Sequence, residues 1–212
     1  YCNTKNQFKV SLALWIILFL NFIPFSGSKA IDTRWTGAVN TDWNNSANWD
    51  YGVPGMFDNA IFSGITVSVS SIDDLINNLV ITNNASLTIA DSLTILGSVT
   101  VYSGSLNIGG QVVYVGGSVT GSGAITANAA KFTVGGDLSI STLSDSGYGE
   151  IYLAGNWSIP NGGFDSDNTI ITFNGVGSQT VTTSADYSMW YWNEVIIDKP
   201  SGTIVFSYPF DT

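Results

Sequence analysis

The chain has 212 residues, of which 44% are hydrophobic and only 10% are charged, and its formal net charge is −10. Sixteen acidic residues against six basic ones disfavour binding to nucleic acid and to anionic membrane surfaces. The sequence contains no histidine, which excludes a Ser-His-Asp or Cys-His catalytic arrangement and zinc sites built from histidine and cysteine. Its 23 glycines and many Ser, Thr, Asn, Val and Ile residues are typical of an all-β chain rich in turns.

Residues 1–30 have the composition of a secretory signal peptide. Two lysines give a positive start, the stretch 10–25 is a nearly continuous apolar run, and Ser28 and Ala30 are small residues at a cleavage site. We therefore expect cleavage after Ala30 and a protein that is secreted or held at the cell surface or outer membrane. The alternative is a membrane anchor, since the apolar run is close to the lower end of membrane-spanning lengths. The single cysteine, Cys2, lies in this segment, so the mature chain is expected to contain no disulfide.

Residues 31–60 differ sharply from the rest of the chain. Trp35, Trp43 and Trp49 lie among Asp, Asn and Gly residues, and no strand period is visible. A stack of repeats needs its first coil covered, because that coil otherwise exposes apolar side chains and unpaired backbone groups. We therefore predict that 31–60 is an N-terminal cap and that a β-helix occupies 61–212.

The cap segment also resembles the opening motif of large secreted bacterial β-solenoid proteins of the cell surface. These are proteins with autotransporter-associated β-strand repeats and related surface proteins of the adhesin type. The resemblance is carried by five short stretches, in chain order: Trp35-Thr36-Gly37, Asp42-Trp43, Ala47-Asn48-Trp49, Gly52-Val53-Pro54 and Asp58-Asn59-Ala60-Ile61-Phe62. It implies a right-handed β-helix and a cell-surface setting, and it implies no reaction.

Short strands are expected from residue 61 onward. Runs of β-branched and other apolar residues predict strands at 65–69, 75–76 and 79–81. Asparagine tolerates left-handed backbone angles and bonds its own chain, which suits tight bends. Four asparagines are therefore expected at the bends of this region: Asn77, Asn78, Asn83 and Asn84.

A unit of 19 residues is repeated three times over 86–142, with copies that start at Ser86, Ser105 and Ala124. The first copy contains three apolar-polar-apolar triplets, six residues apart. A strand turns alternate side chains to opposite faces, so the outer members of each triplet should point inward and the middle one to solvent. Repeats of this kind predict a three-sided, single-stranded parallel β-helix.

The 19-residue spacing also predicts which side chains stack on one another. Three columns are expected: Leu87, Leu106 and Ile125 in the interior, Thr88, Asn107 and Thr126 on the outward side, and Gly97, Gly116 and Gly135 at a corner. The same 19-residue spacing places Thr94 next to Val113 and Phe132. This argues against the regular threonine columns of an ice-binding solenoid.

Beyond residue 143 the coils become longer and less regular. Strands are expected at 151–153, 157–159, 170–173, 195–197 and 204–206, separated by loops at 144–149, 160–168 and 183–191. Because the chain ends just after a strand-like run, we expect it to be truncated at its C-terminus.

Four acids in or beside these late loops are the candidates for catalysis, and a glycan-active enzyme, a polysaccharide hydrolase or lyase, would use two of them across a bound sugar. They are Asp145, Glu150, Asp165 and Asp167. The alternative, which we favour, is that they are solvated loop residues and that no residue is catalytic.

Two further sites are considered in the same region. Asp165, Asp167 and Asn168 alternate oxygen ligands as calcium loops do, but no glycine follows at the position that an EF-hand requires. An ordinary turn is the simpler interpretation, with a structural calcium as the alternative and no other cofactor expected. Trp190 and Trp192 could stack on a sugar, or they could lie on one face and cover the stack.

The sequence therefore predicts a secreted or cell-surface, adhesin-like β-helix that makes surface contacts without catalysis. Its expected partner is an extracellular glycan or a component of a cell surface or matrix. No nucleic acid partner is expected, and membrane contact is expected only through the leader or a missing anchor. The alternative functions are a glycan-active enzyme and a carbohydrate-binding module.

Overall fold

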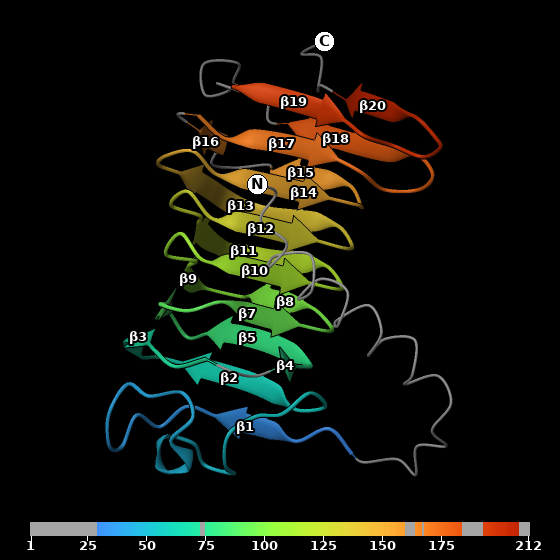
Figure 1. Ribbon diagram of the computed structural model, residues 1–212. Coiled ribbons are helices and arrows are strands. Elements are labelled where there is room, and N and C mark those ends of the chain that lie inside the picture. Colours follow the sequence, from blue (N-terminus) through green and yellow to red (C-terminus); the bar gives the residue numbers. More distant parts are fainter. Residues whose placement is uncertain (1–28, 73–74, 160–163, 167, 184–192, 208–212) are drawn as a thin grey trace, which may run out of the picture.

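The computed structural model describes residues 29–72, 75–159, 164–166, 168–183 and 193–207. In these ranges the chain forms a β-solenoid of about six turns with almost no helix (Figure 1). The named strands pair in parallel, each with the strand one turn before or after it. Among the described residues, no helix is both long and apolar enough to cross a membrane.

The strands line three faces of the stack. The first face is formed by β1 (Asp32–Arg34), β2 (Asn59–Ser63), β5 (Asn78–Thr82), β8 (Val99–Val101), β11 (Val119–Thr126), β13 (Leu138–Asp145), β15 (Trp157–Ile159), β18 (Gln179–Thr183) and β20 (Ile204–Ser207). The second face is formed by β3 (Thr66–Val69), β6 (Ala85–Ile89), β9 (Gly104–Asn107), the far ends of β11 and β13, and β16 (Phe164–Ser166). The third is formed by β4 (Leu75–Ile76), β7 (Leu93–Ile95), β10 (Val112–Val115), β12 (Lys131–Val134), β14 (Glu150–Leu153), β17 (Ile170–Phe173) and β19 (Glu194–Ile197).

The predicted interior column is confirmed. Leu87 pairs with Leu106, Leu106 pairs with Ile125, and the column continues to Leu143 and Phe164. All five side chains are fully buried. The triplets alternate as expected, since the outer residues of β7 and β8 are buried while the middle ones are half-buried. Each coil thus buries its apolar side chains only because neighbouring coils cover them.

The predicted register is wrong by one residue between two of the coils. Thr94 pairs with Tyr114 rather than with Val113, a spacing of 20 residues. The reason is one additional residue in the turn that leads into β10, where Gly109 and Gly110 both have positive φ angles, of 65° and 75°. The glycine column at the corner shifts by the same residue. Backbone hydrogen bonds link Gly97, Gly117, Gly136 and Gly155, instead of the predicted Gly116 and Gly135. Thr94 still has no threonine beside it.

The bends between strands use left-handed backbone angles where asparagine was expected. Asn83 and Asn84 have φ angles of 52° and 56°, as the sequence predicts. Asn78 does not lie in a bend, because it is the first residue of β5. The turn at Asn128 and Ala129, with φ angles of 51° and 63°, was not predicted.

A ladder of polar side chains runs along one corner of the stack. The side-chain oxygen of one coil accepts a hydrogen bond from the backbone N–H of the next, at 2.7 Å from Ser98 to Asn78 and 2.7 Å from Asn156 to Asp137. The same pattern continues through Ser118 and ends at Thr180. This corner ladder satisfies backbone donors that the turns would otherwise leave without partners.

The tryptophans of the cap segment form a buried cluster at the N-terminal end of the stack. Trp35, Trp43 and Trp49 are 5%, 0% and 4% exposed. Their ring centroids lie 5.7 Å, 5.8 Å and 5.6 Å from that of Phe62, which belongs to β2. Contrary to the prediction, the segment also contains a strand, since β1 pairs with β2. A 3-10 turn at Ser46–Asn48 completes it.

The last coils are longer than the regular ones. Trp157 pairs with Val181, and Ile170 pairs with Glu194, in each case 24 residues further along the chain. The expected loop at 160–168 contains a short strand, β16, because Phe164 is buried against Trp157 with its ring centroid 5.2 Å away.

Candidate functional site

Asp145 ends β13 and is 3% exposed. One carboxylate oxygen accepts a hydrogen bond from the backbone N–H of Ala129 at 2.6 Å. The other accepts from the hydroxyl of Thr169, a fully buried residue, also at 2.6 Å. A Cβ atom placed on Gly149 would overlap this carboxylate. Asp145 is therefore enclosed between coils, where it connects three turns of the chain.

Glu150 begins β14 and lies in different surroundings from Asp145. Its side chain is 44% exposed and lies 3.5 Å from the ammonium group of Lys131. The hydroxyl of Tyr152 donates to the same carboxylate at 3.1 Å, and the Lys131 ammonium lies 4.9 Å from the centroid of the Tyr152 ring. Glu150 belongs to a surface group on the third face, while Asp145 bonds within the interior.

The remaining predicted site residues are only partly described. Asp165 lies in β16, where its backbone pairs with Ser144. Asn168 is a half-buried residue of a bend. Asp167, Trp190 and Trp192 lie outside the described residues. Within the described ranges, no group of three or more Asp, Glu, His or Cys side chains is close enough to hold a metal ion.

The buried hydrogen bonds of Asp145 lead to a prediction about stability. Asp145→Ala should lower the free energy of unfolding by about 2–3 kcal/mol, because the buried Thr169 hydroxyl and the partly buried N–H of Ala129 lose their acceptor. Thr169→Val should have roughly half that effect, about 1 kcal/mol, because it removes one of the two bonds. Urea unfolding followed by circular dichroism measures both variants. Asp91→Ala is the control, since among the described residues its carboxylate bonds only the N–H of its neighbour Ser92. An Asp145→Ala variant as stable as this control would contradict the structural role.

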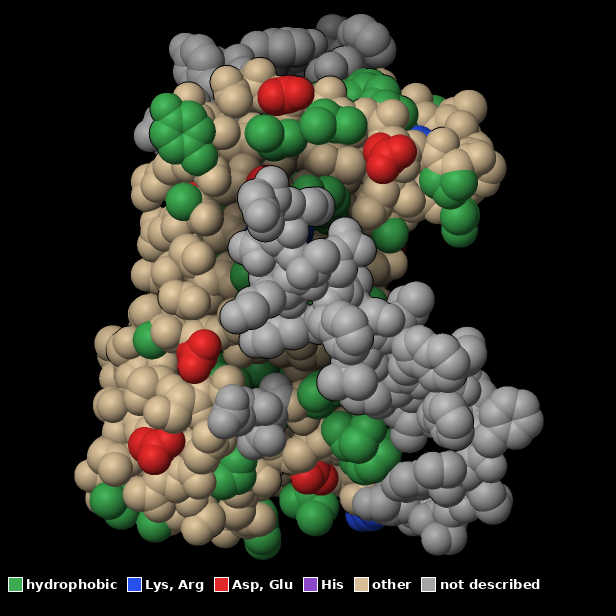
Figure 2. Space-filling model, viewed as in Figure 1, with side chains coloured by type: hydrophobic (Ala, Val, Ile, Leu, Met, Phe, Trp, Pro, Cys, Tyr) green, Lys and Arg blue, Asp and Glu red, His purple; other side chains and the backbone are tan. Residues whose placement is uncertain are grey.

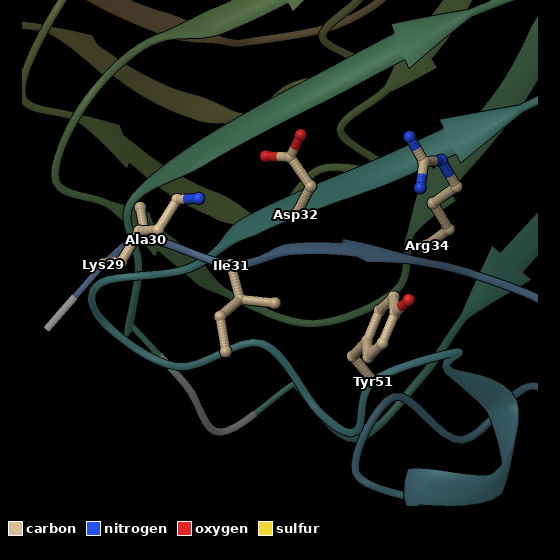
Figure 3. Close-up of a pocket in the computed structure, with 6 residues that line it drawn as sticks. All are labelled: Lys29, Ala30, Ile31, Asp32, Arg34 and Tyr51. Carbon is tan, nitrogen blue, oxygen red and sulfur yellow. The ribbon is translucent and has the colours of Figure 1, made fainter.

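A hollow of about 400 Å³ lies beside the start of β1. Figure 3 shows its lining residues, with Asp32 and Arg34 on one side of the strand and Ile31 on the other. Two of its three charged residues already have partners, because Asp32 accepts from Asn59 at 2.7 Å and Arg34 lies 3.8 Å from Asp50. The hollow therefore presents few unpaired polar groups to a ligand.

The second face carries two straight columns of short side chains, all of them polar except Ala124. We call this surface the hydroxyl face. One column is Thr66, Ser86, Ser105, Ala124 and Thr142, and the other is Ser68, Thr88, Asn107, Thr126 and Ser144. In Figure 2 the left edge of the middle coils is mostly tan, with few charged or hydrophobic side chains. The 19-residue spacing predicted the column of Thr88, Asn107 and Thr126, and the register confirms it and extends it by one coil at each end.

Neighbouring hydroxyl groups on this face contact one another. The Oγ atoms of Ser86 and Ser105 lie 2.9 Å apart, and the hydroxyl of Ser144 donates to that of Thr126 at 3.3 Å. Successive strands are about 4.8 Å apart, and alternate residues of one strand are about 6.6 Å apart. The hydroxyl face is thus a flat lattice of neutral donors and acceptors.

The chain is an all-β solenoid with a buried tryptophan cluster near its N-terminus and a polar flank. No protein-family model, curated protein or solved structure matches it. The solenoid fold is therefore established by the strand pairing itself.

Proposed function

We propose that this chain is a structural contact module of a secreted or cell-surface protein, similar in role to adhesin-type solenoids. The hydroxyl face carries this proposal, because nine of its ten positions over five successive coils present a hydroxyl or amide group in register, Ala124 being the exception. Its partner is a neutral extracellular glycan or a component of a cell surface or matrix. No catalysis is required.

The physical basis is repetition of weak contacts. A single hydroxyl can both donate and accept, and one net hydrogen bond contributes about 0.5–1.5 kcal/mol. A polymer that follows the stack can form several such bonds at once, and linked contacts raise the overall affinity without any single strong site. The net charge of −10 favours a neutral partner over an anionic one.

The support for a catalytic function is weaker. Hydrolysis of a glycan requires two carboxylates on either side of a bound sugar. Asp145 is buried and fully bonded, and Glu150 faces Lys131 on the outer surface. The predicted export signal and the resemblance of the cap segment to surface solenoids both favour the contact module.

Retention of coated beads on immobilised surfaces tests the proposal. Beads carrying the chain are washed over chitin, cellulose and extracellular matrix extract. We expect retention on at least one surface and a loss of about tenfold when Ser105→Glu and Thr126→Glu add charge to the hydroxyl face. The matched control is Thr100→Glu with Thr120→Glu, which adds the same charge to the outward side of the first face.

Three results would contradict it. Retention on none of the surfaces would overturn the contact function. Equal loss in both pairs of variants would show that the hydroxyl face is not the contact surface. Release of soluble sugar from a glycan by the chain alone would support the enzyme instead.

A further inference from the structure

Asp58 accepts a hydrogen bond from the residue that precedes β1. The backbone N–H of Ile31 donates to one carboxylate oxygen of Asp58 at 3.1 Å, across 27 residues of sequence. The other oxygen accepts from the N–H of Gly55 at 3.1 Å, and the N–H of Asp58 donates to the carbonyl of Gly55 at 2.9 Å. The carboxylate is therefore held in place by its own loop while it points at the nitrogen of Ile31.

The peptide bond on the other side of that nitrogen is the predicted cleavage site. Ala30 and Ser28 are the small residues that a signal-peptidase type of enzyme selects. Lys29, Ala30 and Ile31 are all exposed, and Ile31 itself is 50% exposed. The bond lies in extended chain just before β1 and is open to a protease.

We propose that the Ala30–Ile31 bond is a processing site and that Asp58 is the receptor for the N-terminus that hydrolysis creates. Water adds across the bond, so that Ala30 leaves with a carboxylate and the nitrogen of Ile31 becomes an α-ammonium group. The hydrogen bond from a neutral amide to the Asp58 carboxylate then becomes an ion pair in the same geometry. This inference depends on the predicted leader and is independent of the surface-contact function.

The ion pair would strengthen the edge of the sheet. β1 is the first strand of the stack, and its attachment to β2 includes a bond of 2.8 Å from the N–H of Asn59 to the carbonyl of Ile31. Hydrogen bonds with two charged partners are stronger than neutral ones. Processing would also remove Lys29 and Ala30 from the lining of the hollow beside β1 (Figure 3).

The test uses the full chain expressed for export, with mass spectrometry of the product. We expect the exported chain to begin at Ile31. An acylating reagent should then label the Ile31 amine about threefold faster in Asp58→Asn than in the unchanged chain, because the pair protects the ammonium form. Asp91→Asn removes the same charge without touching Ile31 and should leave the rate unchanged. Labelling of Lys131 provides an internal reference.

A second measurement serves if Asp58→Asn folds poorly. Acetylation of the Ile31 amine in the unchanged mature chain should lower the melting temperature by about 1–3 °C, since it removes the charge. An exported chain that begins at another residue would overturn the processing site. A chain that begins at Ile31 but shows neither protection of its amine nor a lower melting temperature on acetylation would overturn the role of Asp58. Neither result bears on retention by the hydroxyl face.

Discussion

Replacing Trp43 by alanine should lower the free energy of unfolding by about 3–5 kcal/mol, the range for removal of a large buried aromatic side chain. Trp43 is fully buried, and its ring centroid lies 4.8 Å from that of Trp49 and 5.8 Å from that of Phe62. Its carbonyl also accepts the indole N–H of Trp49 at 2.8 Å. Loss of this ring would leave a cavity beside the first coil.

Guanidinium unfolding followed by far-UV circular dichroism measures this effect. The control is Tyr51→Ala, an aromatic residue of the same segment that is 73% exposed, for which little change is expected. Equal stability of the two variants would show that the tryptophan cluster does not stabilise the stack. A lower midpoint with an unchanged slope would show that the cap and the coils unfold together.

Replacing Gly104 by alanine should cost about 3–5 kcal/mol, from the sum of backbone strain and overpacking. Gly104 has a φ angle of 95°, in the region that favours glycine. It pairs with Ala85 in the coil below, and an added Cβ would overlap the backbone of Ala85. The spacing between coils leaves no room for a methyl group there, so the two strands would have to separate.

Gly52→Ala separates the two causes. Gly52 has a φ angle of 88°, close to that of Gly104, but a Cβ at this position would meet nothing within 4 Å. Its substitution should therefore cost only the strain of about 1–2 kcal/mol. Urea midpoints of the two variants give the difference, and a Gly104 variant no less stable than the Gly52 variant would contradict the close packing of the coils.

The elements of the fold were largely predictable because one pattern recurs. β7 and β15 lie where strands were predicted, because alternation of apolar and polar residues indicates a strand with one buried side in every coil. The tryptophan cluster was predictable because an uncovered first coil would expose its interior. The register error at Tyr114 arose because a single additional residue in a turn changes the spacing without changing the pattern.

The candidate site was less predictable than the fold. Asp145 is one of several acids in a polar stretch, and its burial depends on Ala129 and Thr169, which lie 16 and 24 residues away in the sequence. The corner ladder through Asn78 and Asp137 was missed for the same reason, because each bond joins residues about one coil apart. Sequence distance alone does not say which of many Ser, Asn and Asp residues share a corner.

By itself, the sequence of this protein determined that the chain coils, how many strands each coil holds and which side chains are buried. These properties follow from local periodicity, which a strand expresses wherever it lies. The 19-residue spacing also placed Thr88, Asn107 and Thr126 in one column, but only the tertiary structure decided how far the hydroxyl face extends and which acid is enclosed. Those contacts depend on the exact rise and register of one coil on the next, and one inserted residue in a turn is enough to change them.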